Sequence, residues 1–434
     1  MIIAGLFFVV MGVLCNQWVI TSFFIPNIVL PIQIKMIIWA FDFVSVGLGL
    51  LLIHFRKNVE VQIGLALAFA TMAVCLFILE AFLRFIDYMP GALNLYMANP
   101  NRAGSFKLKP NLDIITKVGA RDVIIKTNSH GMRWREVSLD IPQTKKRVAF
   151  IGDSFTFGLW ADKVENSLVG VFDSLLESHN FEVLNFGVPA YGFEDMELQI
   201  KENVLPFQPD YIVLMFYSGN DFLDTYLGTE RYYVAKRGVL KLNEENLKSK
   251  IPPEFLNQGS SFHLSVLNKF YLYGLFKHSV KNLWPIQVNE SVVRGSGDSV
   301  DRSYTSNLFW SQINYPEFAV KAKDLSLEVL KDIKQLCDRN HIQLIIVSIP
   351  SVEQVHYPSL FGEGYNIQLP QRYLEEFSKE HSVPYLDLLI PLGNYAREFN
   401  RNLYYQNEGH FNNDGHLISG KLVASFFRQE VVKK

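Results

Sequence analysis

The sequence predicts an α/β domain built on a parallel sheet, preceded by an apolar N-terminal region. The chain has 434 residues, which suits a membrane part plus one larger soluble domain. Apolar residues are concentrated before Pro90, where long segments carry almost no charge. After Pro90, short apolar runs alternate with segments of helical periodicity. Such alternation is typical of a parallel sheet with helices on both faces.

Three apolar runs near the N-terminus are long enough to cross a membrane. They cover residues 1–25, 36–55 and 61–78, and about 20 apolar residues span a bilayer. A cleaved signal peptide is the alternative for the first run, but that run lacks a basic start and two more runs follow it. We therefore expect a membrane region over residues 1–87, with about three transmembrane helices.

The charges around these runs do not settle the orientation of the membrane region. Arg56 and Lys57 lie between the second and third runs, and the positive-inside rule would place them in the cytoplasm. The following domain would then lie outside. Lys35, Arg84 and Arg102 weigh against that orientation, so the charge rule alone comes close to a tie.

Residues 88–434 carry the strand and helix signals of the larger domain. The clearest helix has an apolar stripe at helical spacing that includes Ala322, Val329 and Ile333. Between residues 224 and 316 the alternation fails, and an insertion of this length is usually a lid, a substrate-binding surface or a mobile loop. Short buried strands are expected over residues 148–151, 183–185, 211–216, 343–349 and 385–388.

Composition excludes several classes of function. The net charge is -2 and the signs are mixed along the chain, so we expect no nucleic-acid partner. The chain has three cysteines, too few for a disulfide framework, and none lies near a His/Cys cluster. We expect neither a metal nor an organic cofactor.

Ser154 is the leading candidate for a nucleophile. It follows Gly152-Asp153 at the end of an apolar run, which places its hydroxyl at the carboxyl edge of the predicted sheet. A serine hydroxyl attacks well only when a neighbouring base takes its proton. A helix starting near Phe155 would add backbone N–H groups for an oxyanion. The alternative is an ordinary helix cap.

Three more positions could complete a hydrolytic site. Gly187 follows the second strand and would let the backbone approach a ligand closely. Asn220 follows the third strand, and its amide could donate to an oxyanion. Near the C-terminus, His410 and His416 are both candidates for the general base. Taken singly, each of these motifs could be a plain turn or a polar loop.

These blocks, in this order, resemble the SGNH (GDSL-type) hydrolase superfamily, and specifically a membrane-anchored bacterial subgroup. The resemblance extends upstream to Phe106-Lys-Leu-Lys-Pro-Asn111 and Thr127-Asn-Ser-His-Gly-Met-Arg133. It implies a flavodoxin-like three-layer α/β/α fold. It also implies Ser154 as the nucleophile. The oxyanion hole would consist of the Ser154 N–H, the Gly187 N–H and the side-chain amide of Asn220. By the same resemblance His410 is the base and His416 a structural residue.

The acid that orients the base departs from the family pattern. The family usually has Asp three residues before the histidine, and here that position is Asn407. Glu408 is adjacent, and we expect it to take the place of the acid. A backbone carbonyl or Asn407 itself is the alternative, and the loss of a charged partner can be costly in rate.

The resemblance leads us to expect a membrane-anchored serine esterase or acylhydrolase. It would act on acyl esters, such as O-acetyl esters, of cell-envelope glycans or lipids. One alternative is an O-acyltransferase that modifies polysaccharides. Another, suggested by the missing acid, is a non-catalytic glycan-binding or assembly protein. The expected location is the cytoplasmic membrane, with several spans and the domain outside the cytoplasm.

Overall fold

A computed structural model describes most of the chain, and it divides into two compact units. The first unit is Met1–Ala92 with Ser260–Val300, and the second is Leu93–Gly259 with Asp301–Lys434. All candidate site residues belong to the second unit. The described residues are 5–10, 32–55, 57–85, 94–100, 102, 104–118, 121–140, 144–176, 180–235, 238–256, 272, 308–405 and 409–432.

The first unit contains the helices α3 (Ile32–His54) and α4 (Val59–Phe85). The second and third predicted membrane runs fall on these helices, while most of the first run lies outside the described residues. Over the part of the chain that the structure describes, no helix combines the length and the apolar character needed to cross a membrane. The predicted transmembrane helices are therefore not confirmed.

Five parallel strands form the central sheet of the second unit, in the order β6-β5-β7-β10-β11. Counted along the chain this order is 2-1-3-4-5, the flavodoxin-like arrangement. Every strand predicted from the sequence falls on one of the five, so the predicted parallel sheet is confirmed. The strands are β5 (Lys146–Ile151), β6 (Phe181–Asn185), β7 (Tyr211–Tyr217), β10 (Gln343–Ile349) and β11 (Tyr385–Asp387).

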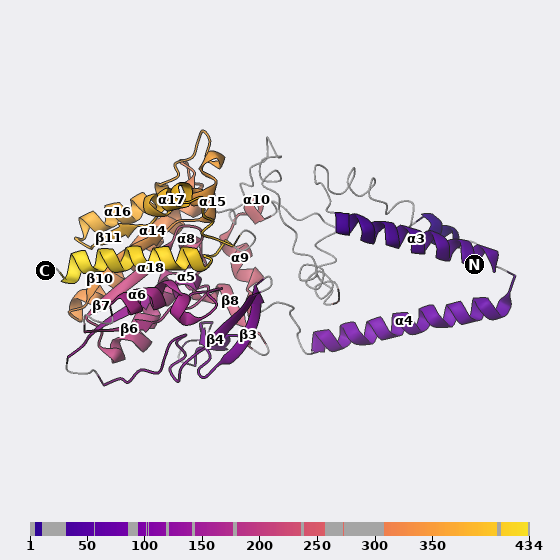
Figure 1. Ribbon diagram of the computed structural model, residues 1–434, viewed down its shortest axis with the longest axis horizontal. Coiled ribbons are helices and arrows are strands. Elements are labelled where there is room, and N and C mark those ends of the chain that lie inside the picture. The colour runs from indigo at the N-terminus through magenta and orange to yellow at the C-terminus, as the bar shows by residue number, and fades with distance from the viewer. Residues whose placement is uncertain are drawn as a thin grey trace. The chain divides into compact units, whose positions relative to one another are not determined.

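Helices cover the sheet on both faces (Figure 1). All seven residues of the central strand β7 are buried, which requires a layer on each side and explains its unbroken apolar sequence. One group of helices is α6 (Leu168–Leu176) with α18 (Asn413–Phe427). A second group is α7 (Phe193–Gln199), α8 (Asp221–Leu227) and α14 (Glu317–Arg339). Other helices of the second unit are α5 (Ser154–Phe157), α15 (Val352–His356), α16 (Leu369–Glu380) and α17 (Leu389–Glu398).

Smaller elements surround the sheet. The segment before β5 forms two antiparallel pairs, β1 with β2 and β3 with β4. The described start of the predicted insertion is ordered into short elements, and Val239 and Ile251 are buried in it. Residues 257–271 and 273–307 lie outside the described residues. The elements are β1 (Tyr96–Ala98), β2 (Phe106–Leu108), β3 (Asp113–Val118), β4 (Arg121–Lys126), β8 (Tyr232–Val234), β9 (Leu240–Leu242), α9 (Glu244–Lys250) and α10 (Pro253–Leu256).

Candidate active site

Ser154 lies where β5 gives way to the short helix α5, at the carboxyl edge of the sheet. The Asp153 side chain caps this helix, because its Oδ1 accepts the Phe155 N–H at 2.9 Å. Gly152 is required in the turn, since a Cβ there would lie 2.2 Å from Thr156 Oγ1. The turn therefore fixes the Ser154 hydroxyl in a nearly buried position.

The structure brings Ser154 and His410 together. Ser154 Oγ lies 2.9 Å from His410 Nε2, although the two residues are 256 positions apart in the chain. The imidazole stacks on the Phe155 ring, with 5.1 Å between the ring centroids. His410 is half-buried. Hydroxyl and imidazole are within the reach needed for direct proton transfer.

His416 occupies a different place. It lies in the first turn of α18 and is fully buried. Its Nδ1 accepts the Leu168 N–H at 3.3 Å, and its Nε2 lies 3.4 Å from the Leu159 carbonyl oxygen. Burial lowers the pKa of His416 to about 3, so the ring is neutral. His416 therefore ties α18 to the start of α6 and to the segment before it, while His410 faces the serine.

Asp153 offers the Ser154 hydroxyl a second partner. Its Oδ2 lies 3.3 Å from Ser154 Oγ, which is longer than the contact with His410. Burial raises the pKa of Asp153 to about 7, the hydrogen bond from Phe155 opposes that rise, and the nearby Asp224 carboxyl adds to it. The Asp153 carboxyl thus caps α5 with one oxygen and faces the Ser154 hydroxyl with the other.

Gly187 packs directly against α5. A Cβ at this position would lie 2.1 Å from the Phe157 backbone nitrogen, so only glycine fits. Its N–H, which the sequence assigned to an oxyanion hole, donates to Asn185 Oδ1 at 2.9 Å. In the structure that donor is therefore engaged within its own turn.

Asn220 follows β7 and precedes the first residue of α8. Its Nδ2 donates to Asp224 Oδ2 at 2.9 Å, which uses one of the two amide hydrogens. Its Oδ1 is buried and has no hydrogen-bond partner among the described residues. An ionised carboxylate accepts hydrogen bonds and repels an amide oxygen, so Asp224 sets which end of the Asn220 amide faces it.

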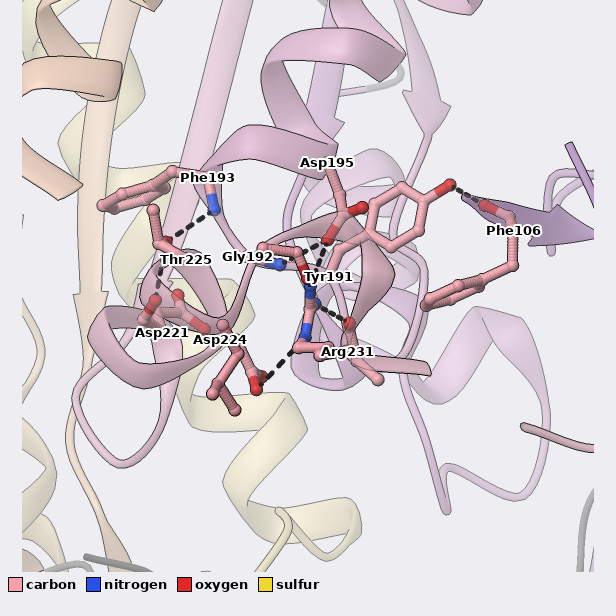
Figure 2. Close-up of polar contacts among 12 residues, drawn as sticks. Phe106, Tyr191, Gly192, Phe193, Asp195, Asp221, Asp224, Thr225 and Arg231 are labelled. Atoms are coloured by element: carbon pink, nitrogen blue, oxygen red, sulfur yellow. Dashed lines mark hydrogen bonds and ion pairs between the residues drawn. The ribbon is translucent and has the colours of Figure 1, made fainter. Parts of the chain in front are cut away.

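Asp224 belongs to a buried ionic cluster that sequence reasoning missed (Figure 2). Arg231 lies between Asp195 and Asp224, and all three side chains are almost completely buried. Arg231 Nη1 donates to Asp195 Oδ2 at 2.8 Å, and Arg231 Nε lies 3.3 Å from Asp224 Oδ1. Burial raises the pKa of Asp224 to about 6, while Arg231 opposes that rise. The guanidinium also donates to the Gly228 and Ala190 carbonyl oxygens.

Asn407 and Glu408 are the two side chains considered for orienting His410. Asn407 and Glu408 both lie outside the described residues. The role of Glu408 therefore stays a prediction.

Among the comparisons with known proteins, the one with solved structures found similar chains. The sequence matches no protein-family model and no curated protein. An acetyl xylan esterase, AlAXEase, has 13% sequence identity and a TM-score of 0.35, over 66% of this chain and 99% of that one. A second acetylxylan esterase, Axe2 from Geobacillus stearothermophilus, has 13% identity and a TM-score of 0.35, over 67% and 96%.

A third solved structure, described as a lipolytic protein of the G-D-S-L family from Desulfitobacterium hafniense, has 14% identity. Its TM-score is 0.32, over 65% of this chain and 99% of that one. Because these TM-scores are low, the fold is identified by its sheet order, and the site by the contact between Ser154 and His410.

Proposed function

We propose that this protein is a serine hydrolase of the SGNH type that cleaves acyl esters. The observation that carries the proposal is the 2.9 Å contact between Ser154 Oγ and His410 Nε2. A hydroxyl paired with an imidazole at the carboxyl edge of a parallel sheet is an arrangement suited to nucleophilic catalysis.

In the proposed reaction, Ser154 Oγ attacks the acyl carbonyl carbon while His410 Nε2 takes the hydroxyl proton. The tetrahedral intermediate collapses when His410 returns that proton to the leaving alkoxide, and an acyl-serine ester remains. A water molecule then attacks this ester, and His410 again serves as base and then as acid. The products are an alcohol and a carboxylic acid.

The developing oxyanion needs hydrogen-bond donors. We assign this role to the Ser154 N–H, to the second amide hydrogen of Asn220, and to the Gly187 N–H. The Gly187 N–H donates to Asn185 in the structure, so the oxyanion has to replace that acceptor. A charged oxygen is a stronger acceptor than a neutral amide oxygen, which favours this exchange.

We also propose that Glu408 orients the far nitrogen of His410. Its support is its position two residues before the histidine, beside the site of the usual family acid. Glu408→Gln should then lower kcat while Asn407→Ala has a smaller effect. The reverse order would assign the orienting role to Asn407.

The proposed substrates are short acyl esters, O-acetyl groups among them, on cell-envelope glycans or lipids. The resemblance of the sequence blocks to membrane-anchored bacterial SGNH proteins supports this class. We further propose that the N-terminal unit attaches the domain to the cytoplasmic membrane, with the site outside the cytoplasm. Large apolar side chains exposed on α3 and α4, such as Phe43 and Phe77, support that attachment. The test is to wash membranes from cells that make the full chain with alkaline carbonate. Recovery of the chain in the supernatant would contradict the proposed attachment.

The test of the proposed activity uses the full chain with p-nitrophenyl acetate and a fluorophosphonate probe. The wild type should hydrolyse the ester and become labelled, and Ser154→Ala should do neither. Ser249→Ala, an exposed serine in α9, is the matched control and should behave as the wild type. Equal hydrolysis by Ser154→Ala would remove Ser154 from its role. Acyl transfer to an added glycan, without release of free acid, would assign a transferase.

A further inference from the structure

Arg133 ends an upstream sequence block that the proposed reaction leaves without a role. Its side chain is 1% exposed, although a buried arginine usually has a carboxylate partner. All four of its hydrogen bonds go to backbone carbonyl oxygens, and among the described residues no carboxylate forms an ion pair with it. The buried guanidinium therefore serves to hold backbone segments together.

Two of the four carbonyl groups lie at the end of α5, the helix that Ser154 begins. Arg133 Nη1 donates to the Gly158 carbonyl oxygen, and it lies 3.4 Å from that of Phe157. Phe157 is the last residue of α5, and Gly158 is its C-cap. Carbonyl groups at a helix C-terminus have no partner within the helix, so a cation is favourable there. The guanidinium also lies 5.1 Å from the centroid of the Phe157 ring, which adds a second contact with the same turn.

The other arm of the guanidinium reaches two further segments. Arg133 Nη2 donates to the Ile124 carbonyl oxygen in β4 at 2.8 Å and to the Ala161 carbonyl oxygen at 3.0 Å. One side chain thus joins the end of α5, the loop that follows it and the antiparallel pair formed by β3 and β4.

The end of α5 is linked to two parts of the proposed site. The Gly158 N–H donates back to the carbonyl oxygens of Ser154 and Phe155. On the other side, a Cβ at Gly187 would lie 2.1 Å from the Phe157 backbone nitrogen, so the two backbones are in close contact. A shift of residues 157–158 would therefore move Ser154 relative to Gly187.

We propose that Arg133 is a positioning residue for the nucleophile, an inference that rests on the proposed function. Its guanidinium holds the C-terminal end of α5, so that Ser154 keeps its place between His410 and the oxyanion donors. A displacement of about 1 Å at a reacting group can cost about 10²-fold in rate. Lysine keeps the charge but lacks the planar fork that reaches several acceptors at once.

Arg147 is the matched control, because it is buried in the same way at the other end of β5. It is completely buried, and its two Nη atoms donate to four backbone carbonyl oxygens. It lies near the start of β5, whereas Ser154 follows the end of that strand. Arg147→Lys should therefore lower stability without displacing α5.

The test uses the full-length protein and p-nitrophenyl acetate. A fluorophosphonate probe counts the competent sites, so that kcat is expressed per labelled site and unfolded molecules do not contribute. Arg133→Lys should lower this kcat about tenfold and Arg133→Met about 10²-fold, with KM nearly unchanged. Arg147→Lys should keep the wild-type kcat per labelled site. Denaturant titration should show a lower midpoint for all three variants.

A wild-type kcat per labelled site in both Arg133 variants would overturn the proposal, and so would an equal fall in Arg147→Lys. Failure of both Arg133 variants to fold would assign this side chain to folding alone, and would overturn the proposal too. None of these results touches the esterase itself. A wild type that neither hydrolyses the ester nor becomes labelled would instead overturn the proposed function.

Discussion

The Ser154–His410 contact and the Asp195–Arg231–Asp224 cluster belong to the same unit and are built in opposite ways. The first is a single hydrogen bond between a hydroxyl and a half-buried imidazole. The second places three ionisable side chains in the interior and surrounds one guanidinium with four oxygen partners. A proton can move between Ser154 and His410, whereas removal of any member of the cluster would leave a buried charge without its partner.

In the proposed reaction, Asn220 links the two regions. Asp224 accepts a hydrogen bond from the Asn220 amide and is itself paired with Arg231. The buried charges thus orient a proposed oxyanion donor, while the pair proposed to transfer the proton includes a half-buried histidine. This division suits catalysis, because donors to an oxyanion help most when they need no reorganisation during the reaction.

The largest expected effect comes from breaking the Ser154–His410 pair. His410→Ala should lower kcat for p-nitrophenyl acetate by about 10⁴-fold, since Ser154 would lose the base that takes its proton. Steady-state kinetics and fluorophosphonate labelling measure this loss. His381→Gln, at the end of α16, is the control and should keep full activity. A His410→Ala enzyme with near wild-type rates would assign the base to another group.

Breaking the rigid cluster should cost stability. Arg231→Leu leaves Asp195 and Asp224 buried without their partner, and should lower the free energy of unfolding by about 3–5 kcal/mol. Denaturant titration followed by circular dichroism measures the change. The matched control is Arg135→Leu, which breaks a half-exposed pair with Asp173 and should cost about 1 kcal/mol or less. Equal losses in the two variants would show that burial does not distinguish the two ion pairs.

Removing the side-chain amide of Asn220 tests its assignment to the oxyanion hole. Asn220→Ala should lower kcat for the aryl ester by about 10²-fold and leave KM nearly unchanged, since the lost hydrogen bond forms only with the oxyanion. Stopped assays over a range of ester concentrations separate the two constants. A rise in KM at constant kcat would instead place Asn220 in ground-state binding.

A smaller effect is expected when the amide stays and its charged partner changes. Asp224→Asn keeps the size of the side chain but no longer dictates which end of the Asn220 amide faces it. We expect kcat to fall about tenfold, the loss of one oriented hydrogen bond. The double variant Asn220→Ala/Asp224→Asn should be no slower than Asn220→Ala alone. Fully additive losses would show that Asp224 acts independently of Asn220.

Sequence patterns predicted the sheet and the Ser154–His410 pairing, but not the cluster. The strand segments were readable because parallel strands are buried on both faces, as the all-apolar β7 shows. Ser154 and His410 lie in short motifs, and the order of these motifs along the chain indicated a hydrolytic site. Arg231 lies in a polar insertion, and a charged residue in such a segment is ordinarily exposed. The engagement of the Gly187 N–H by Asn185 depends on the turn geometry, which no spacing reveals.

The two histidines of the C-terminal block, His410 and His416, also differ in burial. The burial of His416 predicts that the stability of the protein depends on pH. The pKa of buried His416 is lowered to about 3 in the folded protein, against an ordinary value near 6.5 in the unfolded chain. The unfolded state therefore binds more protons than the folded state between these pH values, and stability falls as the pH drops below about 6.5.

His416→Gln removes this pH-dependent contribution to stability, so the stability difference between wild type and variant should shrink steadily from pH 7 to pH 4. Thermal unfolding across that range measures it, with His130→Gln, an exposed histidine, as control. A difference that stays constant with pH would mean that His416 is not held neutral by burial, and that its two backbone contacts alone explain its place in the fold.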